Sequence, residues 1–338
     1  MPISIVVGGQ YGSESKGKVT QYITNKYKDS IVVRVGGSNS GHTGINNKNK
    51  LIVLRQLPVS SLNKNKMCVL SPGSYINIEV LMKEIKVSGI KPTELLIDNK
   101  AVIVTDKDIE LEKSSGLGNN ISSTLSGNGQ AVINRVSRTN KIIFAIDVEI
   151  LKPYLCNTTD YLRKELNKNR RVIIEGNQGF GLSNLHSKTY PYVTSRDTTA
   201  AGFLSEVGLS PLDVDQIWLV LRTFPIRVGG NSGPLKYETN WETISKISGI
   251  NNLIEHTSVT NKIRRVGYFD SELVKDAIMY NTPTYIVLNH LDYIDKNCFL
   301  NNQLSKKALE FIKKISNEIE KKITHVGYSK YDLSEIFY

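Results

Sequence analysis

A loop rich in glycine and lysine follows the first predicted strand of the chain. An apolar, β-branched run at residues 3–7 predicts a buried strand, and GGQYGSESKGK follows it at residues 8–18. Val19, Ile23 and Tyr27 come next at helical spacing, which predicts an amphipathic helix. Backbone N–H groups, the helix dipole and the lysines would all favour an anion there. The segment therefore predicts a phosphate site, and an ordinary glycine turn is the alternative.

The loop differs at one position from the common nucleotide-binding form. Residues 12–18 fit the pattern G-x-x-x-x-G-K, but Val19 stands where a serine or threonine would hold Mg²⁺. The placement of the loop directly after a strand favours nucleotide binding over a plain turn.

His42 lies in a second glycine-rich loop. A β-branched run at residues 31–35 ends in GGSNSGHTG, residues 36–44. Open α/β sheets bind ligands at the carboxyl ends of their strands, so we expect the two loops to line one crevice. An imidazolium beside a phosphoryl group can donate a proton or stabilise developing charge. His42 is therefore a candidate catalytic residue, with a structural histidine as the alternative.

Two further segments have the composition of recognition sites. NHLD at residues 289–292 resembles the base-reading motif of guanine nucleotide proteins, in which Asp292 would accept from the ring N–H and amino group of guanine. A helix cap is the alternative. Residues 257–265, TSVTNKIRR, combine hydroxyls and cations that suit a carboxylate substrate, although a charged surface turn has the same composition.

Alternating strands and helices must position these segments. Apolar runs at residues 51–54, 67–70, 95–97, 102–104, 172–176, 217–221 and 284–288 predict further strands, and residues 78–85 and 304–323 have helical periodicity. The small-residue loop 114–129 is long enough to indicate a functional segment, followed by a helix with Arg135 and Arg138. The pattern predicts an α/β fold with a central, mainly parallel sheet flanked by helices, in a single domain over residues 1–338.

Composition limits the class of partner. The net charge of +11 comes from dispersed lysines without a basic block, which favours anionic small molecules and argues against nucleic acid. No apolar run is long enough to cross a membrane, and the N-terminus enters a strand directly. Three scattered cysteines, Cys68, Cys156 and Cys298, are typical of a reducing compartment. We expect a cytoplasmic protein without membrane or nucleic-acid partners.

The order of the motifs resembles one family. The first loop, GGSNSGHTG, GNQGF with TYPYVTSRDTTAAG, RVGGNSGPL, TNKIRRVGYFD and NHLDYID follow one another as in adenylosuccinate synthetases, from end to end of the chain. The resemblance implies a homodimer that joins L-aspartate to the 6-position of a purine nucleotide. A nucleoside triphosphate with Mg²⁺ would first phosphorylate the base oxygen, and the aspartate amine would then displace phosphate. The short chain resembles the compact archaeal and viral branch.

The resemblance also implies roles for individual residues. The catalytic residues would be Ser13 and His42, and the carbonyl of Gly41 with Ser13 would contact Mg²⁺. The triphosphate donor would be held by Gly12, Ser13, Glu14, Ser15, Lys16, Gly17, Lys18, Gly41, His42, Thr43, Asn289, His290, Asp292 and Gly327. The purine monophosphate would be held by Ser13, Asn39, Ser123, Thr124, Gln178, Leu182, Thr194 and, from the neighbouring subunit, Arg138. Aspartate would be held by Val228, Gly229, Thr260, Lys262 and Arg264.

One departure from the family bears on the substrate. The usual loop is G-D-E-G-K-G-K, and here Ser13 replaces the aspartate that removes the proton from purine N1. Serine lacks a carboxylate, is shorter, and leaves space beside N1 for a 2-amino group. This substitution resembles the viral 2-aminoadenylosuccinate synthetases, which implies dGMP, L-aspartate and ATP as substrates and a host cytoplasm. The product would be 2-amino-2′-deoxyadenylosuccinate, a precursor of diaminopurine DNA.

Other departures concern the donor and leave alternatives open. His290 replaces a lysine, and Gly327 is followed by Tyr328 where a proline is usual, which weakens the inference to GTP. Asp292 still favours guanine, so GTP stays possible. Lys262 replaces an arginine and cannot make a bidentate fork. The alternatives are an ordinary adenylosuccinate synthetase that uses IMP and GTP, and an inactive nucleotide-binding homologue.

Overall fold

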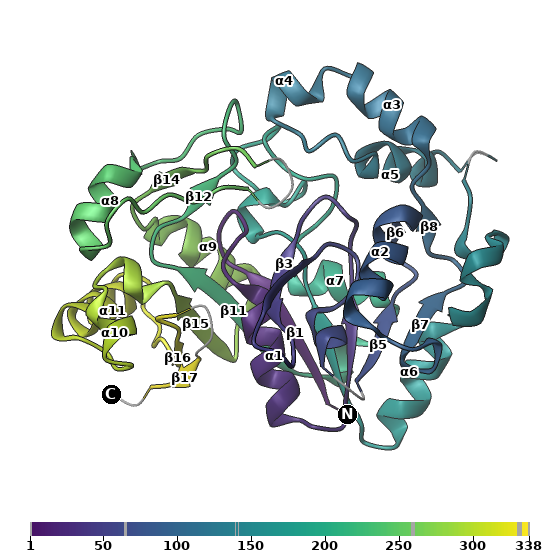
Figure 1. Ribbon diagram of the computed structural model, residues 1–338, viewed down its shortest axis with the longest axis horizontal. Coiled ribbons are helices and arrows are strands. Elements are labelled where there is room, and N and C mark those ends of the chain that lie inside the picture. The colour runs from purple at the N-terminus through teal and green to yellow at the C-terminus, as the bar shows by residue number, and fades with distance from the viewer. Residues whose placement is uncertain are drawn as a thin grey trace.

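The centre of the molecule is a largely parallel β-sheet built from the apolar runs of the sequence (Figure 1). The computed structural model describes residues 2–63, 66–138, 140, 142–257, 261–329 and 333–336. Within these residues the main sheet has ten strands, which in order across it are β17 (Ser334–Glu335), β16 (His325–Val326), β15 (Tyr285–Asn289), β11 (Val214–Arg222), β1 (Ile3–Gly8), β10 (Arg171–Glu175), β2 (Ser30–Arg34), β5 (Met67–Leu70), β7 (Leu95–Asp98) and β9 (Leu155–Cys156). Neighbours pair parallel, except β16 with β17. The predicted fold class is confirmed.

Helices connect and cover these strands. In chain order they are α1 (Lys16–Lys26), α2 (Ile78–Ser88), α3 (Asp106–Ser114), α4 (Leu117–Ile121), α5 (Asn128–Ser137), α6 (Thr158–Asn167), α7 (Ala200–Val207), α8 (Trp241–Ser248), α9 (Ser271–Asn281), α10 (Asn297–Leu300) and α11 (Lys306–Glu318). None of the helices in the described part of the chain is both long and apolar enough to cross a membrane.

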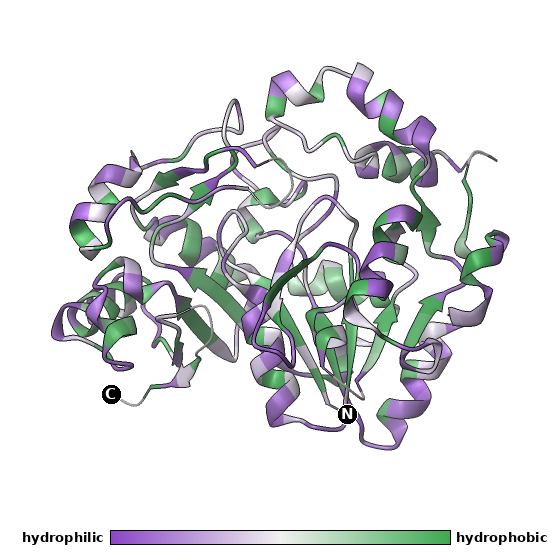
Figure 2. Ribbon diagram, viewed as in Figure 1, coloured by the Kyte–Doolittle hydropathy of each residue, from purple (hydrophilic) through white to green (hydrophobic). Residues whose placement is uncertain are grey.

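Both faces of the sheet are buried against helices. Val7 of β1 belongs to an apolar cluster that includes Phe203 of α7, whereas the preceding Val6 packs in another cluster with Val19 of α1. Successive strand residues point to opposite faces, which is why the strands of this sheet are hydrophobic runs rather than alternating ones. Figure 2 shows these strands as the hydrophobic centre of the molecule. Each fully buried aliphatic side chain contributes about 1.5–3 kcal/mol.

Three small sheets lie outside the main one. An antiparallel sheet is formed by β12 (Ile226–Arg227), β14 (Arg265–Gly267) and β13 (Glu238–Thr239), a hairpin by β3 (His42–Ile45) and β4 (Leu51–Leu54), and a parallel pair by β6 (Tyr75–Ile76) and β8 (Val102–Ile103). Two predicted strands, 51–54 and 102–104, therefore form outside the main sheet. The predicted loop 114–129 contains the short helix α4.

Candidate active site

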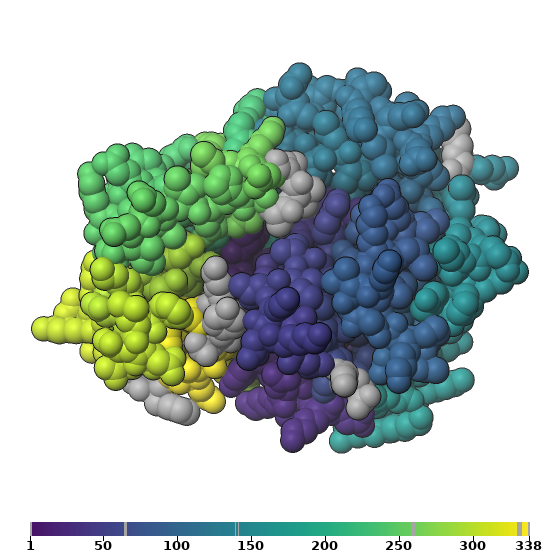
Figure 3. Space-filling view, viewed as in Figure 1, coloured from purple at the N-terminus to yellow at the C-terminus, as the bar shows by residue number. Residues whose placement is uncertain are grey.

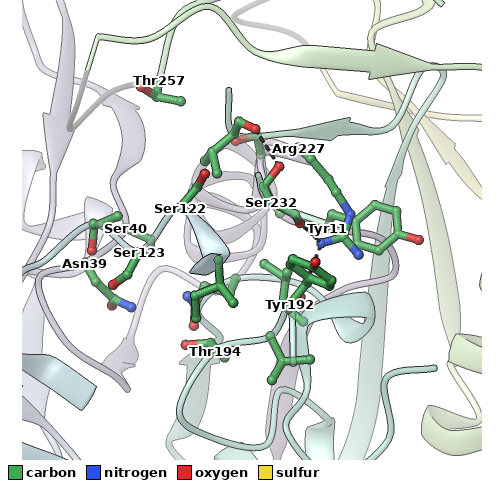
Figure 4. Close-up of a pocket in the computed structure, with 18 of the residues that line it drawn as sticks. Tyr11, Asn39, Ser40, Ser122, Ser123, Tyr192, Thr194, Arg227, Ser232 and Thr257 are labelled. Carbon is green, nitrogen blue, oxygen red and sulfur yellow. Dashed lines mark hydrogen bonds between the residues drawn. The ribbon is translucent and has the colours of Figure 1, made fainter. Parts of the chain in front are cut away.

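The carboxyl ends of the central strands open into a cavity of about 240 Å³. Figure 3 shows the surface hollowed between the segment that carries α8 and β14 and the N-terminal segment, and Figure 4 shows the cavity from inside. Asn39, Ser40 and Ser123 lie on one side of it, and Tyr11 and Arg227 on the other. The predicted site residues that line the cavity are Gly12, Ser13, Lys16, Asn39, Gly41, His42, Ser123, Thr124, Gln178, Leu182, Thr194, Val228 and Arg264.

The phosphate loop is bent by residues with positive φ angles. Gly12 has φ +93°, Ser13 φ 59° and Ser15 φ 69°. A chain that alternates into the left-handed region turns successive backbone N–H groups inward, which makes an anion-binding concavity. Helix α1 begins directly after Ser15, without a side-chain cap, and adds the positive end of its dipole.

Glu14 holds this loop in shape from beneath. Its fully buried carboxylate accepts hydrogen bonds from the backbone N–H groups of Gly12 at 2.7 Å and Gln10 at 3.2 Å, and Lys16 Nζ lies 2.6 Å away. The side chain therefore points into the protein, and only the backbone of Glu14 can face a donor phosphate. Glu14 is not among the residues that line the cavity, so we do not assign it the purine N1 proton.

Ser13 lines the cavity together with Gly12 and Lys16 of the same loop. Its hydroxyl makes no hydrogen bond with any other residue in the described part of the chain, while its carbonyl accepts from Arg222 Nη1 at 3.2 Å. A hydroxyl without a protein partner is available to a ligand.

His42 belongs to a buried charge network that sequence reasoning missed. Its Nδ1 lies 2.5 Å from Glu175 Oε1, and Arg34 Nη1 lies 2.5 Å from the same oxygen. The other oxygen, Oε2, accepts from the backbone N–H of Val59 at 3.1 Å. Arg34 and Glu175 end the neighbouring strands β2 and β10, so the sheet itself fixes the imidazole.

The electrostatics of this network set the protonation of His42. Burial, and then the charge of Arg34, lower the pKa of His42 to about 3. Burial would raise the pKa of Glu175, but Arg34 and the hydrogen bond from His42 hold it below its ordinary value. An ionised carboxylate only accepts, so the neutral ring carries its proton on Nδ1 and leaves Nε2 as an acceptor.

The part of the cavity predicted to hold the monophosphate is lined by small polar groups. Ser123 Oγ donates to Glu112 Oε1 at 2.8 Å, and Thr124 Oγ1 lies 3.1 Å from Ser126 Oγ. Leu182 is placed by its carbonyl, which accepts from the Thr194 N–H at 2.8 Å. Gln178 has φ 62°, and its buried Oε1 has no partner among the described residues.

The side predicted to hold aspartate is less completely described. Arg264 lines the cavity and its Nη1 lies 2.6 Å from Glu255 Oε2. Val228 also lines the cavity, and Gly229 is close enough to the backbone of Ile263 that a Cβ would lie 2.5 Å from its carbonyl oxygen. Lys262 is exposed and lies outside the cavity lining. Thr260 falls outside the described residues.

The predicted donor-base residues gather at the ends of β15 and β16, next to the phosphate loop. Asn289 Nδ2 donates to the carbonyl of Glu14 at 2.8 Å, and His290 Nε2 lies 3.0 Å from Ser15 Oγ. Lys18 Nζ donates to the carbonyl of Ser329 at 2.8 Å. Ser15 stands where the usual family loop, G-D-E-G-K-G-K, has its second glycine, so two residues that differ from the family pattern, Ser15 and His290, contact each other. These residues lie outside the lining of the cavity.

The titratable groups of this region are desolvated. Burial, together with the charge of Arg222, holds the pKa of His290 well below its usual value, so the ring is neutral. Burial raises the pKa of Asp292 to about 6. Gly327 is fixed by its backbone, because its N–H donates to the Leu288 carbonyl at 3.0 Å and its carbonyl accepts from the Leu291 N–H at 3.1 Å.

Arg138 and Thr43 are two further predicted residues outside the lining of the cavity in the single chain. Arg138 is exposed at the C-terminal end of α5, and Thr43 is exposed on β3. Glu175, Arg34, Arg222 and Glu255 contact residues of the cavity lining and were not predicted from the sequence. Three of them are charged residues at the carboxyl ends of apolar strands, which is the pattern that could have revealed them.

The oxygen ligands suit a metal carried by the substrate. Nowhere in the described ranges do three His, Cys, Asp or Glu side chains gather to hold a metal. Ser13 and Gly41 would instead contribute one hydroxyl and one carbonyl to the ion. Mg²⁺ commonly keeps waters and binds substrate phosphates, so this sparse oxygen set fits it.

Comparison with known proteins places the chain in a family. The model of the adenylosuccinate synthetase family matches residues 5–147 and 144–300. The chain belongs to the adenylosuccinate synthetase family. Adenylosuccinate synthetase from Methanocaldococcus jannaschii is 40% identical over 320 residues, covering 92% of this chain and 90% of its own. The protein of that name from Archaeoglobus fulgidus is 34% identical over 332 residues, covering 97% and 95%.

Solved structures share the fold. The fully ligated adenylosuccinate synthetase from Plasmodium falciparum has a TM-score of 0.86 at 21% identity and covers 100% of both chains. The cyanophage S-2L succinoaminodeoxyadenylate synthetase, bound to dGMP and to dATP as an energy donor, has a TM-score of 0.82 at 25% identity, covering 99% of this chain and 95% of its own. The chain is therefore a carbon–nitrogen ligase of the adenylosuccinate synthetase type, a family that binds purine nucleotides and aspartate and is generally Mg²⁺-dependent.

Proposed function

We propose that this ligase joins L-aspartate to C6 of dGMP at the expense of ATP, through a 6-phosphoryl intermediate, and forms 2-amino-2′-deoxyadenylosuccinate. The observation that carries the proposal is Ser13, which lines the cavity where the usual family loop has aspartate and whose hydroxyl has no hydrogen-bond partner among the described residues. A 2-amino group can donate to a hydroxyl, and the shorter side chain leaves room for it. The likeness to a phage enzyme bound to dGMP supports the same substrate.

His42 would serve the phosphoryl transfer. In the free protein its pKa is about 3, because of burial and Arg34, so the neutral ring cannot act as an acid at pH 7. A phosphoryl anion placed beside Nε2 adds a negative charge that raises the pKa of the ring. Protonation of His42 would then accompany substrate binding, while Glu175 holds Nδ1 and thus the direction of the ring.

ATP is the proposed donor, with GTP as the alternative. A lysine at position 290 could donate to O6 of guanine, whereas the neutral His290 is engaged with Ser15. Asp292, with a pKa of about 6 because of burial, is partly protonated near neutrality. The protonated form can donate to N1 and accept from the 6-amino group of adenine, and the ionised form suits guanine.

The second candidate function is the ordinary reaction with IMP and GTP. The relatives from Methanocaldococcus and Archaeoglobus are named adenylosuccinate synthetases and share more identity with the chain than the phage enzyme does, which favours this candidate. Both reactions require that another group replace the missing aspartate as the acceptor of the N1 proton, because hypoxanthine and guanine each carry a proton on N1.

One experiment separates the candidates. The purified protein is given L-aspartate and Mg²⁺ with dGMP or IMP and with ATP or GTP, and products are resolved by chromatography. Conversion of dGMP with IMP inert supports the proposal, and turnover of IMP with dGMP inert overturns it. An inactive homologue would release no phosphate in response to aspartate with any pair.

Ser13→Asp tests the steric argument directly. The longer carboxylate would crowd the 2-amino group, so kcat/KM for dGMP is expected to fall by at least about tenfold while use of IMP improves. Ser13→Ala is the matched control, because it keeps the space and removes only the hydroxyl. Its kcat/KM for dGMP should fall less than that of Ser13→Asp. Full dGMP activity in Ser13→Asp would contradict the role given to this residue.

A homodimer is part of the proposal, with Arg138 reaching the neighbouring monophosphate site. Ile133 and Val136 are 57% and 71% exposed on α5, the helix that ends at Arg138. Exposed aliphatic side chains beside a cation on one helix suit a protein interface.

A further inference from the structure

Glu255 is surrounded by donors from three segments of the chain. Its Oε1 accepts from Arg222 Nη2 at 2.5 Å and from the Tyr293 hydroxyl at 2.8 Å. Its Oε2 accepts from Arg264 Nη1 at 2.6 Å and from Arg222 Nη1 at 3.3 Å. The carboxylate is thus fully used in bonds to protein groups and is not itself a ligand for substrate.

The backbone of Arg264 is fixed on both sides. Its N–H donates to the Glu255 carbonyl at 2.9 Å, and its own carbonyl accepts from Trp241 Nε1 at 2.7 Å. With the backbone held, the remaining freedom lies in the side chain, which the Glu255 carboxylate holds by Nη1 alone.

The opposite edge of the Arg264 guanidinium makes no hydrogen bond to any residue that the structure describes. Its Nε is buried and has no partner among the residues that the structure describes, and the residue lines the cavity. The edge formed by Nε and Nη2 is a two-donor fork whose spacing matches a carboxylate. A buried N–H without a partner is costly, so a ligand that accepts from it gains affinity.

The charges of this network do not cancel. Burial would raise the pKa of Glu255, but Arg222 and Arg264 hold it well below its usual value, so the side chain is an anion. Two guanidinium groups and one carboxylate leave a surplus of one positive charge. Arg222 is fully buried and also donates to the Ser13 carbonyl, so its charge is not accessible to a ligand. The excess positive charge is therefore available at Arg264.

We propose that Glu255 is a positioning residue that turns the Nε–Nη2 edge of Arg264 toward a carboxylate of the amino-acid substrate. This inference rests on the proposed use of L-aspartate. Glu255 binds no substrate, and it acts by fixing one edge of Arg264 so that the other is ready before aspartate arrives.

Glu255→Gln tests the proposal through separate kinetic constants. The amide has the same shape as the carboxylate but no charge, so it holds Arg264 less firmly. The KM for aspartate is therefore expected to rise about tenfold, the size of effect expected when one charge-assisted hydrogen bond to the substrate is weakened. The KM for the purine nucleotide should change less than about twofold by the same argument. The first half-reaction, followed as aspartate-independent isotope scrambling in the triphosphate, should proceed at close to the wild-type rate. An unchanged KM for aspartate, or an equal loss in all three measurements, would overturn the proposal.

Two further variants keep the test informative if Glu255→Gln folds poorly. Glu255→Asp retains the charge between the arginines and should fold, with a KM for aspartate between those of wild type and Glu255→Gln. Glu238→Gln is the matched control, because Glu238 pairs with the adjacent Arg265 at 2.5 Å, and Arg265 does not line the cavity. The Glu238→Gln variant should leave the KM for aspartate unchanged. A wild-type protein that releases no phosphate with aspartate would instead count against the proposed function.

Discussion

Two carboxylates, the fully buried Glu175 and the partly exposed Glu255, hold different parts of the cavity lining in the same way. Each is paired with an arginine that ends a strand of the main sheet, Arg34 of β2 or Arg222 of β11. Each also holds a second side chain that lines the cavity, His42 in one case and Arg264 in the other.

The difference lies in what the held side chain can do. An imidazole gains or loses a proton near neutrality, whereas a guanidinium stays charged. Glu175 therefore decides where a proton sits, and Glu255 decides where a positive charge points. In the proposed roles, one arrangement of strand-end charges would serve proton transfer on one side and anion recognition on the other.

Removal of the held imidazole should have the largest effect on activity. His42→Asn is expected to lower kcat by about 10²- to 10⁴-fold, the range for loss of a general acid. The KM values should change little, because a proton given in the transition state does not bind the ground state. A kcat within a few-fold of wild type in steady-state assays would show that His42 is structural.

Removal of the carboxylate charge at Glu175 should cost stability as well as activity. Glu175→Gln leaves Arg34 buried without a counter-charge and is expected to reduce the free energy of unfolding by about 3–5 kcal/mol. Urea denaturation measures the change. Glu79→Gln, which breaks the exposed pair with Lys83, is the control and should leave the midpoint unchanged. An equal, small shift in both variants would mean that the buried pair does not support the fold.

A smaller effect should appear in the dependence of stability on pH. His42 has a pKa of about 3 in the fold, because of burial and Arg34, against about 6.5 in the unfolded chain, so the unfolded state binds more protons between these values. Stability from this group is therefore lost as pH falls below 6.5. Between pH 7 and 5 the loss is about 2 kcal/mol.

The pH dependence of the free energy of unfolding also distinguishes the network around Glu175 from the network around Glu255. His42→Asn should lack the loss between pH 7 and 5, and the difference between the two proteins cancels the opposite effects of Asp292 and Glu206, whose pKa values burial raises. Glu255, with its pKa lowered, contributes stability above about pH 4.5 that disappears only at more acidic pH. Parallel curves for wild type and His42→Asn would contradict a neutral, buried imidazole.

The sequence was informative where a local pattern carries the physics. Apolar runs predicted β1, β2, β10, β11 and β15, and glycines directly follow the first three of these runs. Buried strands and the turns that end them leave such composition signals within a few residues. The phosphate loop and His42 were predicted for the same reason. The predicted strand at residues 51–54 instead pairs with β3, a choice that alternation alone does not decide.

The charge networks were missed because their members are distant in sequence. His42 and Glu175 are 133 residues apart, and Arg222 and Glu255 are 33 apart. The sequence around Glu175 or Glu255 does not indicate which arginine or histidine each glutamate pairs with, because the pairing depends on the tertiary fold. The inward orientation of Glu14 is not predictable from the sequence for a related reason, because its partners include backbone N–H groups whose direction depends on the φ angles of the loop.

The inward-pointing Glu14 separates two duties within the phosphate loop. Its carboxylate ties Gly12, Gln10 and Lys16 together, so the curvature of the loop does not depend on the side chain of Ser13. Residue 13 can then be exchanged while the cradle around it persists. A single substitution at residue 13 could therefore change the substrate preference during evolution. The loop would keep its structure, and no destabilised intermediate protein would be needed.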